Sequence, residues 1–327
     1  MHRTLSQLTI LTLTLVFSSL AHAGEMIAYE KSPVTPAPPT TPERPFADAR
    51  RPISNPTLFD LAIPQTLIHP IIAYHRLPGA MNTILGDVPV GGHVEVYALQ
   101  LEIALNERLS INAVKDGYIR FRPDQTLTEI SGWANVGAGV KYAWLYKPEE
   151  NLAANFQLVY EIPMGNQKVF QGSGDGKIIP SLNFLKLWDR WQVADQFGFE
   201  IPLDGDAESS VFYNSFHISY AVTDWLFPMF EANVWTVMST GDGGQRFNDQ
   251  VGGAIPSLVT FEGHDLFNFG ASNGDINGTL VTFALGARLR VPNTDTLDLG
   301  FGWEFPVTSD SKSVIRDRFY FDAVYRF

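Results

Sequence analysis

Apolar and polar residues alternate along most of the chain after about residue 60. In the stretch 93–106, Tyr97 and Leu99 share one face of an extended chain, whereas Gln100 and Glu102 share the opposite face. Successive side chains of a β-strand point to opposite faces, so this period of two predicts a strand with one apolar and one polar face. The strands predicted in this way span residues 64–77, 93–106, 109–122, 132–147, 151–163, 177–188, 190–203, 210–223, 225–238, 278–291, 297–307 and 314–327.

The predicted strands are too long for an ordinary soluble protein. Most alternate for about 10 to 14 residues, whereas strands of soluble proteins usually have about five or six. A strand of about 9–11 residues crosses a bilayer when it is tilted, with its apolar face toward lipid and its polar face toward the lumen. Three polar residues fall on apolar faces, namely Lys115, Asp195 and Asn214. A bulge near Gly117 would correct the first, whereas the other two either lie near an interface or indicate a register that is off by one.

Tight turns alternate with longer links, of which the longest is 239–277; the turns are 106–108, 148–150, 189–190, 223–224 and 293–295. Outer-membrane barrels have short periplasmic turns, longer extracellular loops and, in bacteria, an even number of strands. Residues 61–327 are therefore predicted to form an all-β fold, a transmembrane antiparallel up-and-down β-barrel of about twelve strands.

The last predicted strand carries an aromatic alternation that ends at the carboxy terminus. Phe319, Phe321, Tyr325 and Phe327 share one face of this strand. An aromatic final residue after such an alternation resembles the signal by which outer-membrane barrels are recognised for insertion. We therefore expect these four side chains to face lipid and to bind the barrel-insertion machinery.

The first 60 residues form two different segments. Residues 1–23 combine a positively charged start, an uncharged apolar run and small residues at Ala21 and Ala23, which is the pattern of a cleavable signal peptide. Residues 24–60 are rich in proline and have no apolar period, which predicts a disordered periplasmic leader. An alternative is that this leader folds into the lumen as a plug. The chain is thus expected to be exported to the cell outer membrane.

Three strands that run outward end in the same pattern of an aromatic residue, a glutamate, an apolar residue and a proline. The glutamates are Glu161, Glu200 and Glu304. The aromatic residue suits the interfacial girdle, and the proline ends the ladder because it has no N–H to donate. The glutamate lies on the opposite face, so three carboxylates are expected near the extracellular mouth of the lumen.

Other polar side chains fall on the same inward faces. Twelve strands about 4.8 Å apart and tilted by about 40–45° give a backbone radius of about 13 Å, so inward side chains leave a narrow channel at most. Charges of both signs in this space could pair and brace the barrel, or form a constriction that selects solutes by charge and size. The expected interior residues are Glu231, Asn233, Gln157, Asn155, Lys141, Arg288, Arg290, Glu102, Asp298, Asp322 and Arg318.

Composition narrows the function further. The net charge of −12 disfavours nucleic acid as a partner, and the absence of cysteine excludes disulfides, thiolate catalysis and cysteine metal sites. No cofactor or metal is expected, since the histidines have no ligand spacing. We expect a monomer in outer-membrane lipid that passes small solutes through its lumen and is not an enzyme.

Two other functions remain open. The barrel could be a non-conducting structural or adhesion element of the envelope, closed by the leader or by the 239–277 loop. It could also be an outer-membrane lipid hydrolase, because His217 and Ser219 share a face of one strand. That face is the predicted lumen, whereas a lipid hydrolase must present its catalytic pair to the bilayer. No orienting carboxamide or carboxylate can be named from the sequence.

Two short motifs resemble a known family. Residues 131–142 carry a glycine-rich strand that ends in Lys141-Tyr142, and residues 160–165 read Tyr-Glu-Ile-Pro-Met-Gly. Both are similar to strands of the outer-membrane transporter barrels associated with the meta-pathway of phenol degradation, although Asn135 stands where that family commonly has Asp. The resemblance covers most of the chain after about residue 60. It implies a conduit for solutes or hydrophobic compounds.

Overall fold

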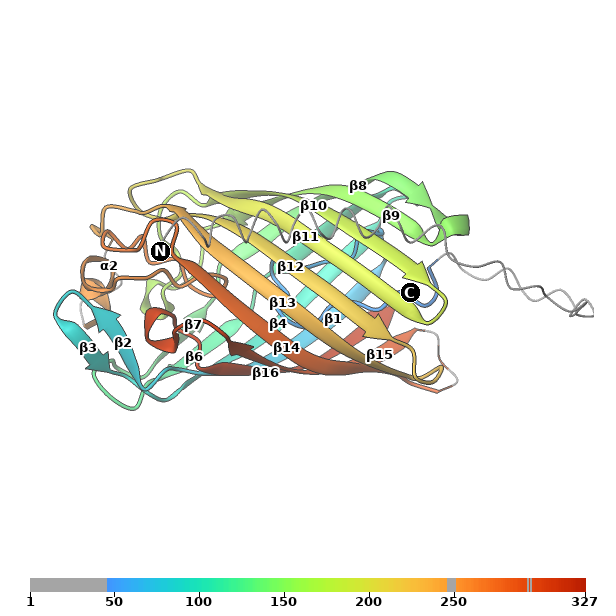
Figure 1. Ribbon diagram of the computed structural model, residues 1–327. Helices are drawn as coiled ribbons and strands as arrows, with labels where there is room; N and C mark the ends of the chain where they lie inside the picture. Colours follow the sequence, from blue (N-terminus) through green and yellow to red (C-terminus); the bar gives the residue numbers. More distant parts are fainter. Residues whose placement is uncertain (1–45, 246–250, 293, 295) are drawn as a thin grey trace, which may run out of the picture. The chain divides into compact units, whose positions relative to one another are not determined.

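Fourteen strands form one sheet that closes on itself. Each strand is antiparallel to its neighbours, and β1 completes the ring by pairing with both β4 and β16 (Figure 1). The strands are β1 (Leu67–Arg76), β4 (His93–Ala104), β5 (Leu109–Lys115), β6 (Tyr118–Arg122), β7 (Ile130–Trp133), β8 (Val136–Lys147), β9 (Leu152–Ile162), β10 (Lys177–Trp188), β11 (Trp191–Pro202), β12 (Ser210–Tyr220), β13 (Leu226–Ser239), β14 (Thr279–Arg290), β15 (Leu297–Pro306) and β16 (Asp317–Arg326).

The fourteen strands make twelve spans of a barrel. β5 and β6 both pair with β4 and follow each other along one span, and β7 and β8 form the next span. The prediction of a twelve-stranded antiparallel barrel is confirmed, and each predicted strand is found within a few residues of its expected bounds. The structure is a computed structural model that describes residues 46–245, 251–292, 294 and 296–327. The predicted signal peptide and residues 24–45 lie outside these ranges.

The links differ in length at the two ends of the barrel. One end, here called the turn end, has the short links, and the other, the loop end, has the long ones. The loop end carries the hairpin of β2 (Ala80–Thr83) and β3 (Gly86–Pro89) and most of the short helices (Figure 1). The helices are η1 (Pro148–Glu150), η2 (Gln167–Val169), η3 (Val251–Ala254), α2 (Ile255–Leu258) and η4 (Asp310–Lys312). No helix in the described ranges has the length and apolarity that a membrane span requires.

The outer and inner faces of the barrel have opposite chemistry. Along β9, Phe156 and Leu158 are exposed on the outside, whereas Asn155 and Gln157 are buried inside. Tryptophans such as Trp188 stand exposed at the turn end, where an interfacial girdle belongs. This is the inverse of a soluble protein and suits a barrel surrounded by lipid.

The span formed by β5 and β6 is interrupted where Lys115 did not fit the pattern. The register shifts between Ala113 and Lys115, and Asp116 and Gly117 separate the two strands. Gly117 has φ +119°, and a Cβ there would lie 2.6 Å from the carbonyl oxygen of Tyr97, so only glycine suits the position. The irregularity turns Lys115 into the lumen, as the predicted bulge near Gly117 required.

The other two misfits have a different explanation. Asp195 and Asn214 do lie on the outward faces of the neighbouring strands β11 and β12. The Nδ2 of Asn214 donates to Oδ1 of Asp195 at 3.0 Å and to the carbonyl oxygen of Gln196 at 3.2 Å. The two polar side chains therefore satisfy each other on a face that is otherwise apolar, and the register is as predicted.

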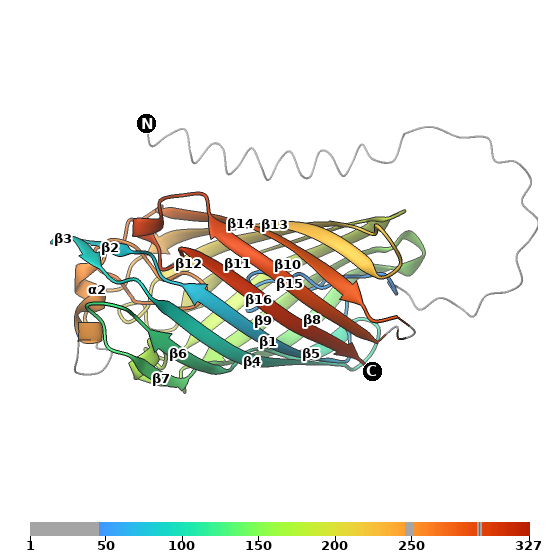
Figure 2. The ribbon, with the colours of Figure 1, turned by 90° about the horizontal axis from the view of Figure 1, so that it is seen from below.

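Residues 46–66, here called the inner segment, lie inside the ring of strands. They form the blue trace that precedes β1 in Figures 1 and 2. Asp48 is near Arg290 at the turn end, Asn55 reaches Tyr320 in the loop half, and Thr66 is back at the turn end beside Phe327. Residues 46–60 thus differ from the disordered leader expected for 24–60, because their side chains are mostly buried against the barrel wall.

Candidate functional site

The lumen gathers every polar residue that the sequence placed inside. All fourteen expected mouth and interior residues are buried, and none faces the outside of the barrel. They do not line an open tube, because the inner segment and the loops of the loop end occupy the space between them. The geometry of the lumen is therefore a set of contacts between wall residues and these inserted segments.

The first set of contacts surrounds Lys141 of β8. Its Nζ lies 2.9 Å from Oδ2 of Asp60 and 2.9 Å from Oε1 of Glu102, and it donates to the carbonyl oxygens of Leu61 and Ile63 at 3.1 and 3.3 Å. An arginine of the inner segment completes the group, since the guanidinium of Arg51 lies 2.8 Å from Asp60. We call Arg51, Asp60, Glu102 and Lys141 the Lys141 cluster. It joins the inner segment to two wall strands by balanced buried charges.

Wall arginines hold the inner segment nearer the turn end. Arg288 of β14 binds Asp322 through two hydrogen bonds of 2.7 and 2.8 Å, and it donates to the carbonyl oxygens of Arg51 and, at 2.9 Å, Pro52. Arg290 contacts Asp48 and Asp298, each at 3.1 Å. Asp322 fixes the orientation of the Arg288 guanidinium, and this guanidinium in turn binds the backbone oxygens of the inner segment. Charge-assisted hydrogen bonds of this kind attach the inner segment firmly to the wall.

The His217 and Ser219 pair lies in the lumen and acquires a carboxylate partner. Nδ1 of His217 is 2.7 Å from Glu231, and its Nε2 is 3.0 Å from Oγ of Ser219. The order matches a hydrolytic triad, but Ser219 also accepts a hydrogen bond from Arg50 at 3.1 Å and is only 2% exposed. Glu231 accepts the backbone N–H groups of two inner-segment residues, Ile53 and Ser54. These residues hold the inner segment rather than face the bilayer.

The three expected mouth glutamates belong to two separate groups. Glu161 and Glu200 share Lys177, whose Nζ lies 3.5 and 2.8 Å from their carboxylates, and Lys115 binds Glu161 at 2.7 Å. Glu304 lies elsewhere, where it accepts the hydroxyl of Tyr320 at 2.7 Å. Sequence reasoning named neither lysine as a partner of these glutamates, because Lys177 was noted only as the start of a strand and Lys115 only as a break in the alternation.

A further carboxyl, that of Glu208, lies beside the Glu161 and Glu200 group. It is buried in the link between β11 and β12 and accepts a hydrogen bond from Oγ of Ser173 at 3.2 Å. Burial raises the pKa of Glu208 to about 7, and Lys177 offsets this only in part. Three carboxyls face only two ammonium groups here, so Glu208 takes up a proton more readily than it would in the unfolded chain.

This raised pKa predicts that packing at the loop end weakens as the pH rises. The native state binds the extra proton, so the stabilisation is complete below the ordinary pKa of 4.5 and is lost as the pH passes through about 7. Hydrogen exchange of the link 203–209 should therefore accelerate between about pH 5 and about pH 8, beyond the intrinsic change. Glu208→Gln, which mimics the protonated carboxyl, should remove that excess. An equal acceleration in this variant would show that another group titrates.

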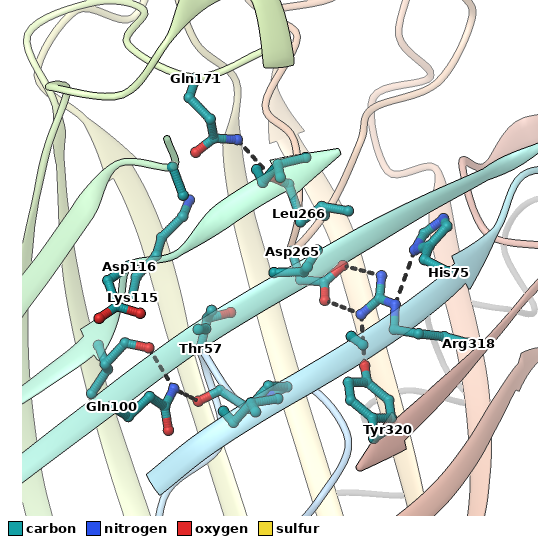
Figure 3. Close-up of a pocket in the computed structure, with 18 residues that line it drawn as sticks. Thr57, His75, Gln100, Lys115, Asp116, Gln171, Asp265, Leu266, Arg318 and Tyr320 are labelled. Carbon is teal, nitrogen blue, oxygen red and sulfur yellow. Dashed lines mark hydrogen bonds and ion pairs between the residues drawn. The ribbon is translucent and has the colours of Figure 1, made fainter. Parts of the chain in front are cut away.

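Residues 251–278, here called the outer loop, fold into the lumen from the loop end. The carboxylate of Asp265 accepts hydrogen bonds from the guanidinium of Arg318 of β16 at 2.5 and 3.1 Å (Figure 3). The Nε2 of Gln171 donates to the carbonyl oxygen of Leu266 at 2.9 Å. Burial opposes ionisation of Asp265, but Arg318 outweighs it and holds the pKa of this carboxyl below its ordinary value. The pair is therefore ionised at neutral pH.

Aromatic packing adds to the contacts of the outer loop. The rings of Phe267 and Phe269 contact Phe170, with centroids 5.3 and 5.6 Å apart, and Phe267 also contacts Phe121 of the wall. Edge-to-face pairs of this kind favour a fixed arrangement of the rings. The outer loop is thus held in the lumen by an apolar cluster as well as by the ion pair between Asp265 and Arg318.

A small cavity remains between the inner segment and the outer loop. Its volume is about 60 Å³, and Figure 3 shows Thr57 of the inner segment and Leu266 of the outer loop among its walls. The barrel wall contributes both apolar and polar side chains. The apolar residues are Ile71, Ala73, Val96, Ala98, Val114, Ile119 and Ala134, and the polar ones are His75, Gln100, Lys115, Arg318 and Tyr320. In the described part of the chain, no group of three or more histidine, aspartate or glutamate residues is placed to hold a metal ion.

Several solved structures are similar to this chain. An outer membrane channel from Pseudomonas putida F1 superposes with a TM-score of 0.55 at 14% identity, covering 82% of this chain and 97% of that one. The NanC porin gives a TM-score of 0.46 at 7% identity, covering 80% and 99%. The outer membrane protein OprD from Pseudomonas aeruginosa gives 0.34 at 10%, covering 84% and 96%. No curated protein matches by sequence.

The first of these likenesses shows the fold, which is that of an outer-membrane β-barrel. The family evidence comes from the sequence between residues 87 and 313, which matches the family model described as "Putative MetA-pathway of phenol degradation". This match spans more than half of the chain and takes in ten of the twelve spans in full or in large part. The chain belongs to this family of outer-membrane barrels.

Proposed function

We propose that the protein is an outer-membrane channel for small solutes that is closed in this state. The observation that carries the proposal is the inner segment, which fills the lumen through contacts with wall side chains rather than as part of the wall. Residues 46–62 of this segment can leave without breaking any backbone hydrogen bond of the barrel ladder. Short turns face the periplasm and long loops face outward in such barrels, so the inner segment enters from the periplasmic side.

The charged lumen residues act in this proposal as holding contacts more than as an open constriction. The carboxylates of Glu161, Glu200 and Glu304 are each paired with a cation or a hydroxyl in the closed state. Selection of solutes by charge would begin only when the inner segment leaves the lumen. Wall residues that it now covers, such as Glu102 and Arg288, would then face water.

The cavity suggests which solutes the channel takes. The surface that the cavity exposes is mainly apolar, and polar and charged side chains among its lining residues, such as Gln100 and Tyr320, can orient a ligand, as in other small-molecule sites. The family description names phenol degradation, and a small aromatic alcohol has the matching combination of an apolar body and one polar group. We infer that small, weakly polar solutes pass more readily than sugars or ions of similar size.

Filling the cavity should test this solute preference. In an opened variant that lacks residues 24–62, Ala73→Phe places a ring in the cavity wall and should reduce phenol flux into proteoliposomes by about tenfold or more. The matched control is Ala232→Phe, because Ala232 lies on the outward face of β13. Equal flux in the two variants would show that the cavity is not on the solute path.

The carboxy-terminal strand suits the expected interaction with the insertion machinery. Phe321, Tyr325 and Phe327 are exposed on the outside of β16, while Phe319 is half-buried on the same face. Their lipid-facing position supports the inference that this strand is recognised during assembly. We also infer that the channel acts as a monomer, since one chain closes the ring by itself.

A further inference from the structure

We propose that the outer loop and the inner segment are coupled, so that release of the loop loosens the segment. The coupling runs from Asp265 through Arg318 and Tyr320 to Asn55, and by a second branch through Glu304 and Asn233 to Ser54. It rests on the proposed function, because it describes how a channel that is closed from both ends could open both closures together. The structural basis is a set of buried side chains with few alternative partners.

The first link fixes Arg318 between the loop and the wall. Its two terminal nitrogens bind Asp265, and its Nε donates to Nδ1 of His75 at 3.0 Å (Figure 3). Nε2 of His75 in turn lies 2.6 Å from the carbonyl oxygen of Val314, which requires that nitrogen to carry the proton and leaves Nδ1 as an acceptor. Arg318 is thus held on three sides, and Asp265 is the only partner that belongs to the outer loop.

The second link passes through the hydroxyl of Tyr320. This hydroxyl accepts Nη1 of Arg318 at 2.7 Å, donates to Oε2 of Glu304 at 2.7 Å and accepts the backbone N–H of Asn55 at 3.4 Å. One donor and two acceptor positions are the full capacity of a phenolic oxygen. A change at Arg318 therefore changes the contact with Asn55.

The second branch reaches the neighbouring residue of the inner segment. Oε1 of Glu304 accepts Nδ2 of Asn233 at 3.1 Å, and the same nitrogen lies 3.0 Å from Oγ of Ser54. Asn55 has φ +51°, a left-handed conformation that asparagine adopts more readily than most residues. The two branches thus end at adjacent residues of the inner segment, Ser54 and Asn55.

The physical cause of the coupling is competition between two carboxylates for one guanidinium. Nη1 of Arg318 is 2.5 Å from Asp265 and 3.6 Å from Glu304 in the closed state. When the loop leaves, Arg318 remains buried without its main counter-charge, and the nearest one is Glu304. When Arg318 and Glu304 pair more closely, the carboxylate of Glu304 no longer accepts hydrogen bonds from Tyr320 and Asn233 in the same geometry. These two side chains then lose the contact that orients them toward Asn55 and Ser54.

Single cysteines can report the two closures separately, because the chain contains no cysteine. Ala271→Cys reports the outer loop and Ala49→Cys reports the inner segment, and both alanines are buried. The reaction rate of each cysteine with a water-soluble maleimide measures how often its segment opens. Asp265→Asn should raise both rates, and we expect about a tenfold increase for the inner-segment reporter.

Two further variants test the route. In a Tyr320→Phe background, Asp265→Asn should still raise the rate of the loop reporter but raise that of the inner-segment reporter by less than it does with Tyr320 present, because only the branch through Glu304 and Asn233 remains. Glu262→Gln loosens the loop by another route, since Glu262 binds backbone N–H groups within the loop and does not contact Arg318. It should raise the rate of the loop reporter and, because release of the loop withdraws Asp265 from Arg318, the rate of the inner-segment reporter as well.

Two results would overturn the coupling: no response of the loop reporter to Asp265→Asn, or an unchanged inner-segment rate in Asp265→Asn or Glu262→Gln when the loop reporter responds. None of these rates depends on conductance. A channel that conducts after truncation but shows no reporter coupling would refute only this inference. A coupled barrel that never conducts would refute only the proposed function.

Discussion

Lys141→Met is expected to convert the closed barrel into a conducting one. Lys141 is buried and neutralises Asp60 and Glu102 at 2.9 Å each. Removing one partner of a buried ionic group typically costs about 3–5 kcal/mol, because the remaining charges have lost their counter-ion. The lumen can relieve this cost by releasing the inner segment, which carries Asp60 and Arg51 into water. The barrel ladder does not depend on these residues.

The conductance of single molecules in a planar bilayer measures this effect. A penalty of about 3–5 kcal/mol shifts a closed–open equilibrium by a factor of roughly 10² to 10³ or more, so openings should become frequent. Lys147→Met is the matched control, since Lys147 lies on the same strand but is exposed and pairs only with Glu150. A Lys141→Met barrel that folds and stays as silent as this control would argue against the Lys141 cluster as the contact that keeps the segment in place.

Lys177→Met should produce the largest loss of barrel stability. Among the residues that the structure describes, Lys177 is the only cation that contacts Glu200, and it shares Glu161 with Lys115. Its removal therefore leaves a buried excess of negative charge. We expect the free energy of unfolding in denaturant to fall by about 3–5 kcal/mol. Lys186→Met, on the same strand at the turn end, should change it by less than about 1 kcal/mol because Lys186 donates only to an exposed backbone oxygen.

A second substitution should restore what the first removes. Adding Glu200→Gln to Lys177→Met takes away the carboxylate that lost its only cation, so most of the lost stability should return. If the double variant is as unstable as Lys177→Met alone, the loss comes from packing of the lysine stem rather than from charge.

The strands and their two faces could be predicted because both are local properties of the sequence. A period of two assigns each residue to a face, and a lipid environment makes the outward face mainly apolar, so polar residues such as Asn233 and Asp322 could be assigned to the inward face. The interruption at Gly117 was also visible, since Lys115 broke the alternation. These inferences needed no knowledge of which residues meet across the lumen.

The contacts that close the lumen could not be predicted in this way. Lys141 and Asp60 are far apart in sequence, and their meeting depends on the inner segment, whose irregular backbone has no period to read. His217 was assigned to the correct face, but its contact with Glu231 depends on the register between β12 and β13. Asp265 lies in a long link, where the sequence gives no position relative to Arg318.

The central claim is that the inner segment closes an outer-membrane channel, and conductance with and without this segment tests it most directly. Full-length barrels and barrels that lack residues 24–62 should be compared in the same planar bilayer. The account predicts a full-length chain that is closed most of the time and a shortened chain with steady openings. If the shortened barrel folds but passes no current, the lumen is closed by the wall and the outer loop alone. A structural role in the envelope would then describe the protein better than a channel.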